Sequence, residues 1–332
     1  MEYRTLNPAT EELLESFPLA TDAEIEGAIE GARKAFESWR ELSFDRRAEP
    51  LFAVAVALEA RADELGRLMA VEMGKPLAEG VAEANKCALG CRYYGRHAEE
   101  HLEADPRESD GSEAFVRYDP LGPLLAIMPW NFPFWQFFRF AAPALMAGNA
   151  VLLKHAPNTP RCALAIEGLM REAGFPEGLV RSLFLSNEQA AAVIGDSRVR
   201  GVTLTGSTRA GREVAACAGR HLKTMVMELG GSDPFIVFED ADLDRAIHTA
   251  VTARTLNNGQ SCIAAKRFLV QRGIAHEFEL GFRDALQALK MGDPLDPEVD
   301  LGPLATEAIR DELHSQVQAT IAAGGRLVLG GE

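Results

Sequence analysis

Between residues 124 and 229, short apolar runs alternate with stretches of helical periodicity, and this alternation is the feature that most constrains the fold. An apolar run without polar alternation is typical of a strand buried on both faces. The expected strands are 124–128, 151–154, 180–185, 199–204 and 223–229, and the expected helices between them are 159–173, 187–194 and 207–219. Such an order predicts an α/β fold with a doubly wound parallel sheet, which binds nucleotides at its carboxyl edge.

The segments on either side of this sheet differ from each other. The first hundred residues are mostly helical in pattern: Thr21 and Glu24 form a capping box, a helix ends at Gly74-Lys75-Pro76, and another covers 77–101, whereas 5–10 is expected to be a turn. After residue 229 a second α/β pattern follows. Its expected strands are 234–238, 266–271 and 326–329, and its expected helices are 243–254, 274–290 and 305–323.

Composition excludes several classes of function. The 332 residues can hold two domains, and a net charge of −15 argues against nucleic acid or an anionic membrane as a partner. The five cysteines form no CxxC pair, and their odd number favours a reducing compartment. Neither an export signal nor an apolar run of the roughly 18 residues that a membrane span needs is present. We therefore expect a cytoplasmic protein, and no cluster of residues has the spacing of metal ligands.

Cys262 lies in a polar turn, Asn257-Asn258-Gly259-Gln260-Ser261-Cys262, between a helical pattern and an apolar run. A thiol at such a junction can be surrounded by backbone N–H groups and can reach a substrate as a nucleophile. The alternative is a small buried hydrophobic residue, which is what most free cysteines are. The turn alone leaves both readings open.

Other stretches also allow two readings. Residues 205–211 place Gly206 and Gly211 between a strand and a helix, where they either approach a phosphate or serve a tight turn. Asn131, fixed between two prolines in Pro129–Pro133, is either an oxyanion donor or a local turn residue. Lys154, at the end of one expected strand, is either a ligand-binding cation or a solvated side chain. Glu228, near the end of another, is either a general base or a solvated side chain.

Together these stretches carry a resemblance to a known family. The runs PWNFP, TGST, ELGGSDP and NNGQSC and the strand that ends at Lys154 occur in one chain. The sequence resembles the aldehyde dehydrogenase superfamily over nearly its whole length. Detail around the motifs is most similar to bacterial NAD(P)-dependent succinate-semialdehyde dehydrogenases. The resemblance implies a Rossmann-like cofactor domain and a second α/β catalytic domain.

The resemblance also implies roles for individual residues. Cys262 is expected to be the nucleophile, the Asn131 amide to hold the oxyanion, and Glu228 to activate the water that hydrolyses the thioester. Residues expected at NAD or NADP are Trp130, Lys154, Gly206, Ser207, Gly211 and Leu229. Pro157 stands where NAD-restricted relatives place a glutamate, so NADP is expected to be tolerated.

The expected substrate is succinate semialdehyde, whose carboxylate needs a cation. Arg139 matches an arginine that binds this carboxylate in relatives, whereas a second such arginine is replaced by Leu256. Trp135, Phe138 and Phe140 are expected to make the entrance aromatic.

By the same resemblance, residues 1–110 and 121–228 form the cofactor domain, 111–120 belong to an arm that joins a homo-oligomer, and 229–332 form the catalytic domain. Relatives continue well beyond residue 332, so that domain is expected to be incomplete. Three alternatives remain: oxidation of another aldehyde, acyl transfer to CoA, and nucleotide binding without turnover.

Overall fold

The computed structural model describes residues 2–331. Met1, which begins the expected cofactor domain, and Glu332, which ends the expected catalytic domain, lie outside the described residues. At the centre is a five-stranded sheet in the order β7-β6-β5-β8-β9, in which every neighbouring pair is parallel. The strands are β5 (Pro123–Ile127), β6 (Ala150–Lys154), β7 (Val180–Ser182), β8 (Gly201–Thr205) and β9 (Thr224–Glu228). The chain runs outward from β5 to β7 and then returns to β8 on the other side of β5. The doubly wound parallel sheet is therefore confirmed, with the crevice at its switch point beside β5.

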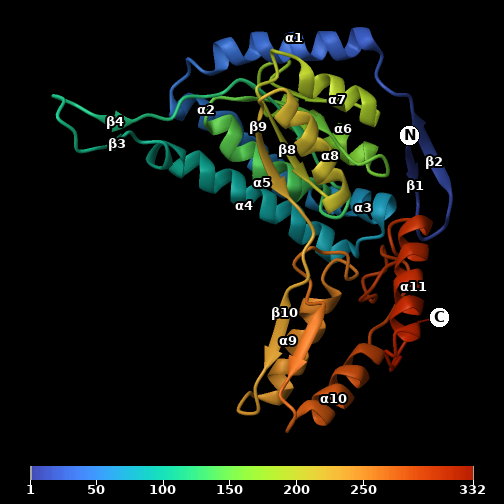
Figure 1. Ribbon diagram of the computed structural model, residues 1–332. Coiled ribbons are helices and arrows are strands. Elements are labelled where there is room, and N and C mark those ends of the chain that lie inside the picture. The colour runs from blue at the N-terminus through green and yellow to red at the C-terminus, as the bar shows by residue number, and fades with distance from the viewer. Residues whose placement is uncertain (1, 332) are drawn as a thin grey trace.

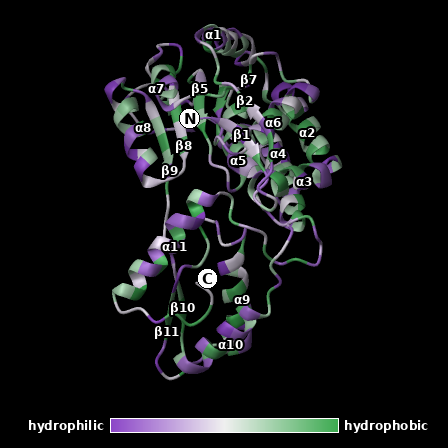
Figure 2. Cartoon of the chain, turned by 90° about the vertical axis from the view of Figure 1, so that its right-hand side faces the viewer, coloured by the Kyte–Doolittle hydropathy of each residue, from purple (hydrophilic) through white to green (hydrophobic). Residues whose placement is uncertain are grey.

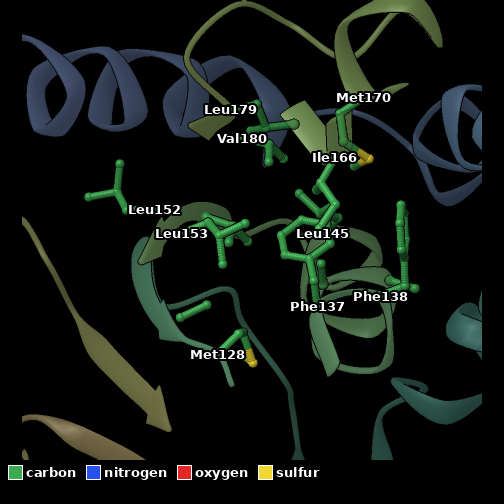
Figure 3. Close-up of a cluster of buried hydrophobic side chains, with 14 of the residues drawn as sticks. Met128, Phe137, Phe138, Leu145, Leu152, Leu153, Ile166, Met170, Leu179 and Val180 are labelled. Atoms are coloured by element: carbon green, nitrogen blue, oxygen red, sulfur yellow. The ribbon is translucent and has the colours of Figure 1, made fainter. Parts of the chain in front are cut away.

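The helices between these strands supply most of the core. They are α5 (Pro133–Met146), α6 (Pro160–Glu172), α7 (Asn187–Gly195) and α8 (Thr208–Arg220). Figure 3 shows Phe137 and Leu145 of α5 close to Ile166 of α6, with Leu153 of β6 in the same cluster. These four side chains are at most 1% exposed, because β6 is covered on both faces. This packing fixes where α5 begins, and so fixes the loop in front of it.

Four helices and a hairpin precede the sheet. They are α1 (Asp22–Trp39), α2 (Phe44–Ala60), α3 (Ala62–Met73) and α4 (Leu77–His101), and the capping box of Thr21 and Glu24 is confirmed at α1. Residues 5–10 are only partly a turn, since they connect β1 (Tyr3–Leu6) to its antiparallel partner β2 (Leu13–Phe17).

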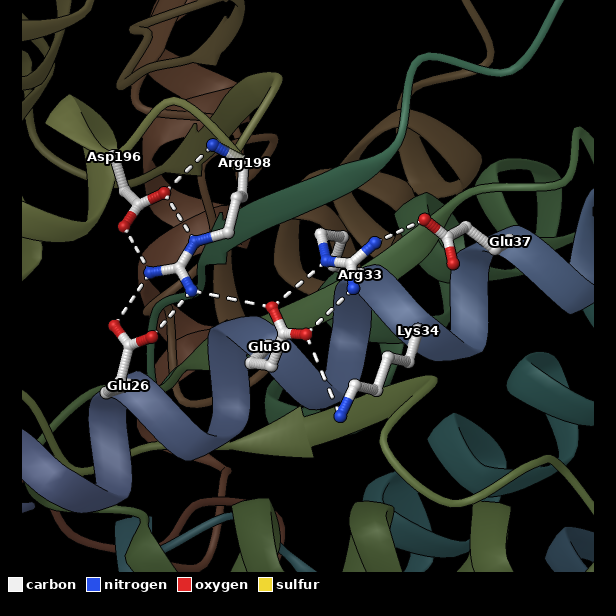
Figure 4. A network of polar contacts seen from close by, with 7 residues as sticks. All are labelled: Glu26, Glu30, Arg33, Lys34, Glu37, Asp196 and Arg198. Carbon is white, nitrogen blue, oxygen red and sulfur yellow. Dashed lines mark hydrogen bonds and ion pairs between the residues drawn. The ribbon is translucent and has the colours of Figure 1, made fainter.

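A polar network fastens α1 to the sheet. In Figure 4, Arg198 from the segment before β8 reaches Glu26 and Glu30 of α1 and also Asp196. The Arg198 guanidinium lowers the pKa of the Asp196 carboxyl, and its own pKa is raised by these hydrogen bonds. The network joins α1 to the segment between α7 and β8, which is distant from it in sequence.

A short antiparallel ribbon projects from the body between α4 and β5 (Figure 1). It consists of β3 (Asp105–Pro106) and β4 (Phe115–Val116), and the side chains of Phe115 and Val116 are exposed.

The last third of the described chain forms a smaller lobe below the sheet in Figure 1. Its elements are β10 (Pro234–Val237), α9 (Leu243–Thr255), β11 (Arg267–Val270), α10 (Ala275–Gln287) and α11 (Glu307–Ala322). The parallel pair β10–β11 packs on a small core of Val237, Ala250 and Phe278. Along α11, Figure 2 shows hydrophilic and hydrophobic residues interleaved, and no residue of this helix is buried.

The strand expected at 326–329 is wrong. None of the strand pairings within residues 2–331 includes this segment, and a strand needs a partner for its backbone groups. Arg326 instead forms an ion pair with Glu279 of α10. Within the same described range, no helix has both the length and the apolar character to cross a bilayer.

Candidate active site

Cys262 ends a tightly folded turn that follows α9. Asn257, Asn258 and Gly259 have left-handed backbone conformations, with φ of 58°, 57° and 72°. Lys266 closes the far side of the turn, since its ammonium donates to the main-chain oxygens of Cys262 at 2.8 Å and Ser261 at 3.0 Å. The four other cysteines are buried, whereas Cys262 is partly exposed. Its position therefore favours the nucleophile over the buried hydrophobic residue.

The structure brings Asn131 to this turn across a sequence separation of 129 residues. The Asn131 Nδ2 donates to the Gln260 oxygen at 2.9 Å, and the Asn131 Oδ1 accepts the N–H of Phe132 at 3.1 Å. Asn257 returns the contact, because its Nδ2 donates to the Asn131 main-chain oxygen at 2.7 Å. The two loops that sequence reasoning singled out thus form one unit.

Glu228 and Arg139 lie close together and line the same cavity. Glu228 is the last residue of β9, and its Oε2 lies 3.8 Å from an Arg139 nitrogen on α5. The same Arg139 nitrogen lies 3.5 Å from the Thr205 hydroxyl, at the end of β8. All three residues line a cavity of about 550 Å³, to which Phe140 and the buried Gln136 also contribute. No hydrogen bond or ion pair within residues 2–331 joins Glu228 to Asn131 or Cys262.

The three aromatic residues expected at the entrance lie in different surroundings. Phe140 lines the cavity of Arg139, as expected. Phe138 is 2% exposed and belongs to the core, so its expected place at an entrance is wrong. It lies on the helix face shared with Phe134 and Ala141, at i, i+4 and i+7, which packs inward. Trp135 faces α4, where the Lys86 ammonium lies 4.2 Å from its ring centroid.

A second cavity, of about 630 Å³, lies at the carboxyl ends of β5, β6 and β8 and is covered by α7 and α8. Lys154 lines it beside Arg209 of α8. Burial of the Lys154 ammonium lowers its pKa to about 8. Two cations in one cavity at the sheet's carboxyl edge suit an anionic nucleotide. The residues present therefore fit the expected dinucleotide.

The turn from β8 to α8 packs against the end of β9. The Gly206 N–H donates to the main-chain oxygen of Glu228 at 3.0 Å. The Ser207 hydroxyl oxygen caps α8 by accepting the Ala210 N–H at 3.2 Å. Gly211 packs against Leu229, since a Cβ at Gly211 would lie 2.5 Å from the Leu229 Cδ2 and the leucine side chain would have to move. Trp130, in the loop before α5, is partly buried. The contacts of this turn hold Gly206, Ser207, Gly211 and Leu229 near one another, and pyrophosphate contact stays a prediction.

Sequence reasoning missed two glutamates of α4 that touch these loops. The Glu79 carboxylate accepts the N–H of Asn257 at 2.8 Å. Glu83 is buried and accepts the N–H groups of Phe134 and Trp135, at the beginning of α5. Their i, i+4 spacing on a helix that is otherwise apolar on that face is the one signal the sequence offers.

The chain is similar in sequence and in structure to known proteins. The sequence model of the aldehyde dehydrogenase family matches residues 1–332. A probable NADP⁺ succinate-semialdehyde dehydrogenase of Synechocystis sp. is 50% identical over the whole chain, which spans 73% of that relative. The NADP⁺ succinate-semialdehyde dehydrogenase 1 of Mycobacterium tuberculosis is also 50% identical, with the same coverage. The crystal structure of the Streptococcus pyogenes succinic semialdehyde dehydrogenase with NADP⁺ superposes with a TM-score of 0.97 at 37% identity, over 99% of this chain and 73% of that one.

Proposed function

We propose, from the premise that this chain belongs to the aldehyde dehydrogenase family, that it oxidises succinate semialdehyde to succinate with NADP⁺. The choice of succinate semialdehyde as the substrate rests on the Arg139 guanidinium, which lines the same cavity as Glu228. A guanidinium binds a carboxylate through two parallel hydrogen bonds, which a neutral aldehyde cannot form. The relatives named for this activity support the same substrate.

Cys262 begins the reaction. Its thiolate attacks the aldehyde carbon, and a carbon–sulfur bond forms while the carbonyl oxygen becomes an oxyanion. The Asn131 amide carries two N–H bonds, of which one is used on Gln260, so the other is free for this oxyanion. A bound nicotinamide would supply the hydride acceptor, and loss of hydride from the former aldehyde carbon leaves a thioester on Cys262.

Glu228 completes the turnover. It takes a proton from water, the hydroxyl adds to the thioester carbon, and the carbon–sulfur bond breaks to give succinate and the thiolate. In the structure the Glu228 side chain is 56% exposed and lies 3.8 Å from Arg139, and no hydrogen bond within residues 2–331 joins its carboxylate to the cysteine loop. The carboxylate of a bound substrate competes for Arg139, and Glu228 is then free to turn toward Cys262. Water as the acceptor distinguishes this reaction from acyl transfer to CoA.

The cofactor is held by the crevice at β6 and α8. Lys154 and Arg209 line it, which supports a nucleotide with an extra 2′-phosphate. Pro157 adds no negative charge near the end of β6, in agreement with NADP⁺ in the names of the relatives. Gly206, Ser207 and Gly211 are proposed at the pyrophosphate, with Trp130 and Leu229 toward the nicotinamide.

The domain assignment and the assembly are part of the same proposal. Residues 1–110 and 121–228 form the cofactor domain, and 229–332 belong to the catalytic domain. The projecting ribbon of β3 and β4, with exposed Phe115 and Val116, supports a contact between copies in a homo-oligomer. Five free cysteines support a reducing compartment such as the cytoplasm.

A spectrophotometric assay tests the function directly. The chain is incubated with succinate semialdehyde and NADP⁺, with and without CoA, and NADPH and succinate are both quantified. We expect NADPH and succinate in equal amounts, at a rate that CoA does not change. A strict requirement for CoA, or no NADPH with this aldehyde while others react, contradicts the proposal.

A further inference from the structure

Two loops form the site, the amide loop at 129–133 and the cysteine loop at 257–262. They come from distant parts of the chain and belong to the two different lobes. One short stretch contacts both: the turn between α3 and α4 together with the first turns of α4, residues 74–83. We call this stretch the frame.

The frame holds the cysteine loop by two hydrogen bonds. The Glu79 Oε2 accepts the N–H of Asn257 at 2.8 Å, and the Asn258 Nδ2 donates to the Gly74 oxygen at 2.7 Å. Asn257 and Asn258 both adopt the left-handed conformation, which costs a non-glycine residue on the order of 1 kcal/mol. Such a turn persists only where outside contacts hold it. Glu79 supplies the contact at its first residue.

The frame also holds the amide loop. Glu83 accepts the N–H groups of Phe134 at 3.0 Å and Trp135 at 2.9 Å, directly after that loop. Lys75 is buried, forms an ion pair with Glu83, and places its ammonium 4.0 Å from the ring centroid of Phe132. The loop that carries Asn131 is thus fixed to the same few residues as the loop that carries Cys262.

Glu79 is well suited to hold a backbone N–H. It lies in the first turn of α4, where the helix end favours a negative charge. Burial raises its pKa, and the nearby Lys75 charge acts in the opposite direction. A hydrogen bond from an N–H to a carboxylate is stronger than one to a neutral acceptor. Nothing in the described residues places Glu79 in contact with Cys262, so it acts through Asn257.

We propose that Glu79 is a positioning residue for Cys262, which fixes the cysteine loop against the amide loop by holding the Asn257 N–H. The reaction that this loop serves is the proposed function above. A displacement of about 1 Å at the reacting groups lowers a rate on the order of 100-fold. The position of the thiol relative to the Asn131 amide therefore depends on a carboxylate that touches neither.

Two measurements on Glu79→Ala test the proposal. The first is kcat and KM with succinate semialdehyde and NADP⁺. The second is the rate at which iodoacetamide alkylates Cys262 without substrate or cofactor, followed by peptide mass spectrometry. We expect kcat to fall on the order of 10- to 100-fold while KM for NADP⁺ stays near wild type, and alkylation to slow, since the turn no longer holds its N–H groups around the thiol. Glu79→Gln keeps an acceptor oxygen and should restore most of both rates.

Glu72→Ala is the matched control. Glu72 is a buried glutamate that, like Glu79, accepts backbone N–H groups, those of Arg161 and Cys162 at the beginning of α6, but it contacts neither loop of the site. Its loss should lower the melting temperature and leave kcat and alkylation unchanged. If either alanine variant does not fold, Glu79→Asp and Glu72→Gln replace them, with the same expectations.

The outcomes separate the two proposals. Wild-type kcat and alkylation in the Glu79 variant overturn the positioning role, as does an equal effect of the Glu72 and Glu79 substitutions. Slower alkylation in a protein that oxidises no succinate semialdehyde supports the positioning role and contradicts the proposed function instead.

Discussion

The Asn131 side-chain amide donates a 2.9 Å hydrogen bond to the main-chain oxygen of Gln260, two residues before Cys262. The group expected to hold the oxyanion is therefore in direct contact with the loop of the expected nucleophile. The contact uses one of the two N–H bonds of the amide. It orients the amide and leaves a donor for the substrate.

Asn131→Ala removes that donor and should lower kcat by about 100- to 1,000-fold, the usual effect of losing one oxyanion donor. Binding of NADP⁺ should stay near wild type, since Asn131 does not line the crevice of Lys154 and Arg209. Steady-state kinetics and a titration of NADP⁺ measure the two effects. Asn149→Ala is a control for loss of a buried amide, because Asn149 bonds Leu121 and Gly122 away from the site. Equal loss of kcat in both variants argues against an oxyanion role.

Arg139→Ala should raise KM for succinate semialdehyde by roughly 10- to 100-fold, because a hydrogen-bonded ion pair contributes about 1.5–3 kcal/mol. Butanal, which has the same chain length without the carboxylate, should lose far less. The pair of Arg139 with Glu228 is 3.8 Å long and its side chains are 37% and 56% exposed, so its loss should change stability little. Arg139→Lys should recover part of the affinity. An equal increase of KM for both aldehydes contradicts the role of Arg139 in binding the substrate carboxylate.

The Lys154 pKa of about 8 gives NADP⁺ binding a pH dependence. Below pH 8 the ammonium is charged and attracts the 2′-phosphate, whereas above it the charge is lost and the dissociation constant should rise. Titrations at pH values on either side of 8, with wild type and with Lys154→Met, measure this change. In Lys154→Met the dependence should be much flatter. The same slope in both proteins assigns it to another group.

The lowered Lys154 pKa also bears on stability. Between about 8 and 10.5 the unfolded chain keeps the proton that the folded protein has released. Because the unfolded state then binds more protons, this group makes the free energy of unfolding increase with pH across that window. Denaturant unfolding of wild type and Lys154→Met at both ends of the window isolates the contribution.

Gly211→Ala tests the contact between α8 and the residue after Glu228. The new Cβ would lie 2.5 Å from the Leu229 Cδ2, but Leu229 is 37% exposed and its side chain can turn away, so the cost should stay below the roughly 1–3 kcal/mol of overpacking in a rigid core. Leu229→Ala in the same chain should remove most of that cost. A double-mutant cycle on the free energy of unfolding measures the coupling. Additive effects indicate that Gly211 serves another purpose.

The sheet could be predicted because its strands are buried on both faces and therefore read as continuous apolar runs. The hairpin of β1 and β2 was missed except for its turn, because β2 is almost wholly exposed and carries no such run. Phe138 was placed at an entrance because the sequence shows only that three aromatic residues are near one another. Which of them faces the core depends on the rotation of α5.

The candidate site was predictable to a similar extent. Asn131, Glu228 and Cys262 could be named because they lie in or beside loops with fixed turn chemistry, and Arg139, on α5, because of the resemblance to relatives. The contributions of Glu79 and Glu83 could not, because each depends on backbone groups more than 50 residues away. A carboxylate on a helix reads as a solvated side chain until its partner is known.

In the proposed reaction Cys262 carries the acyl group, and Glu228→Gln makes that acyl group measurable. The variant is mixed with succinate semialdehyde and NADP⁺, quenched in acid, digested and analysed by mass spectrometry. Loss of the base should slow hydrolysis by about 100- to 10,000-fold, so a stoichiometric burst of NADPH should accompany one succinyl group on the Cys262 peptide. NADPH without that adduct, or the adduct on another cysteine, contradicts the account.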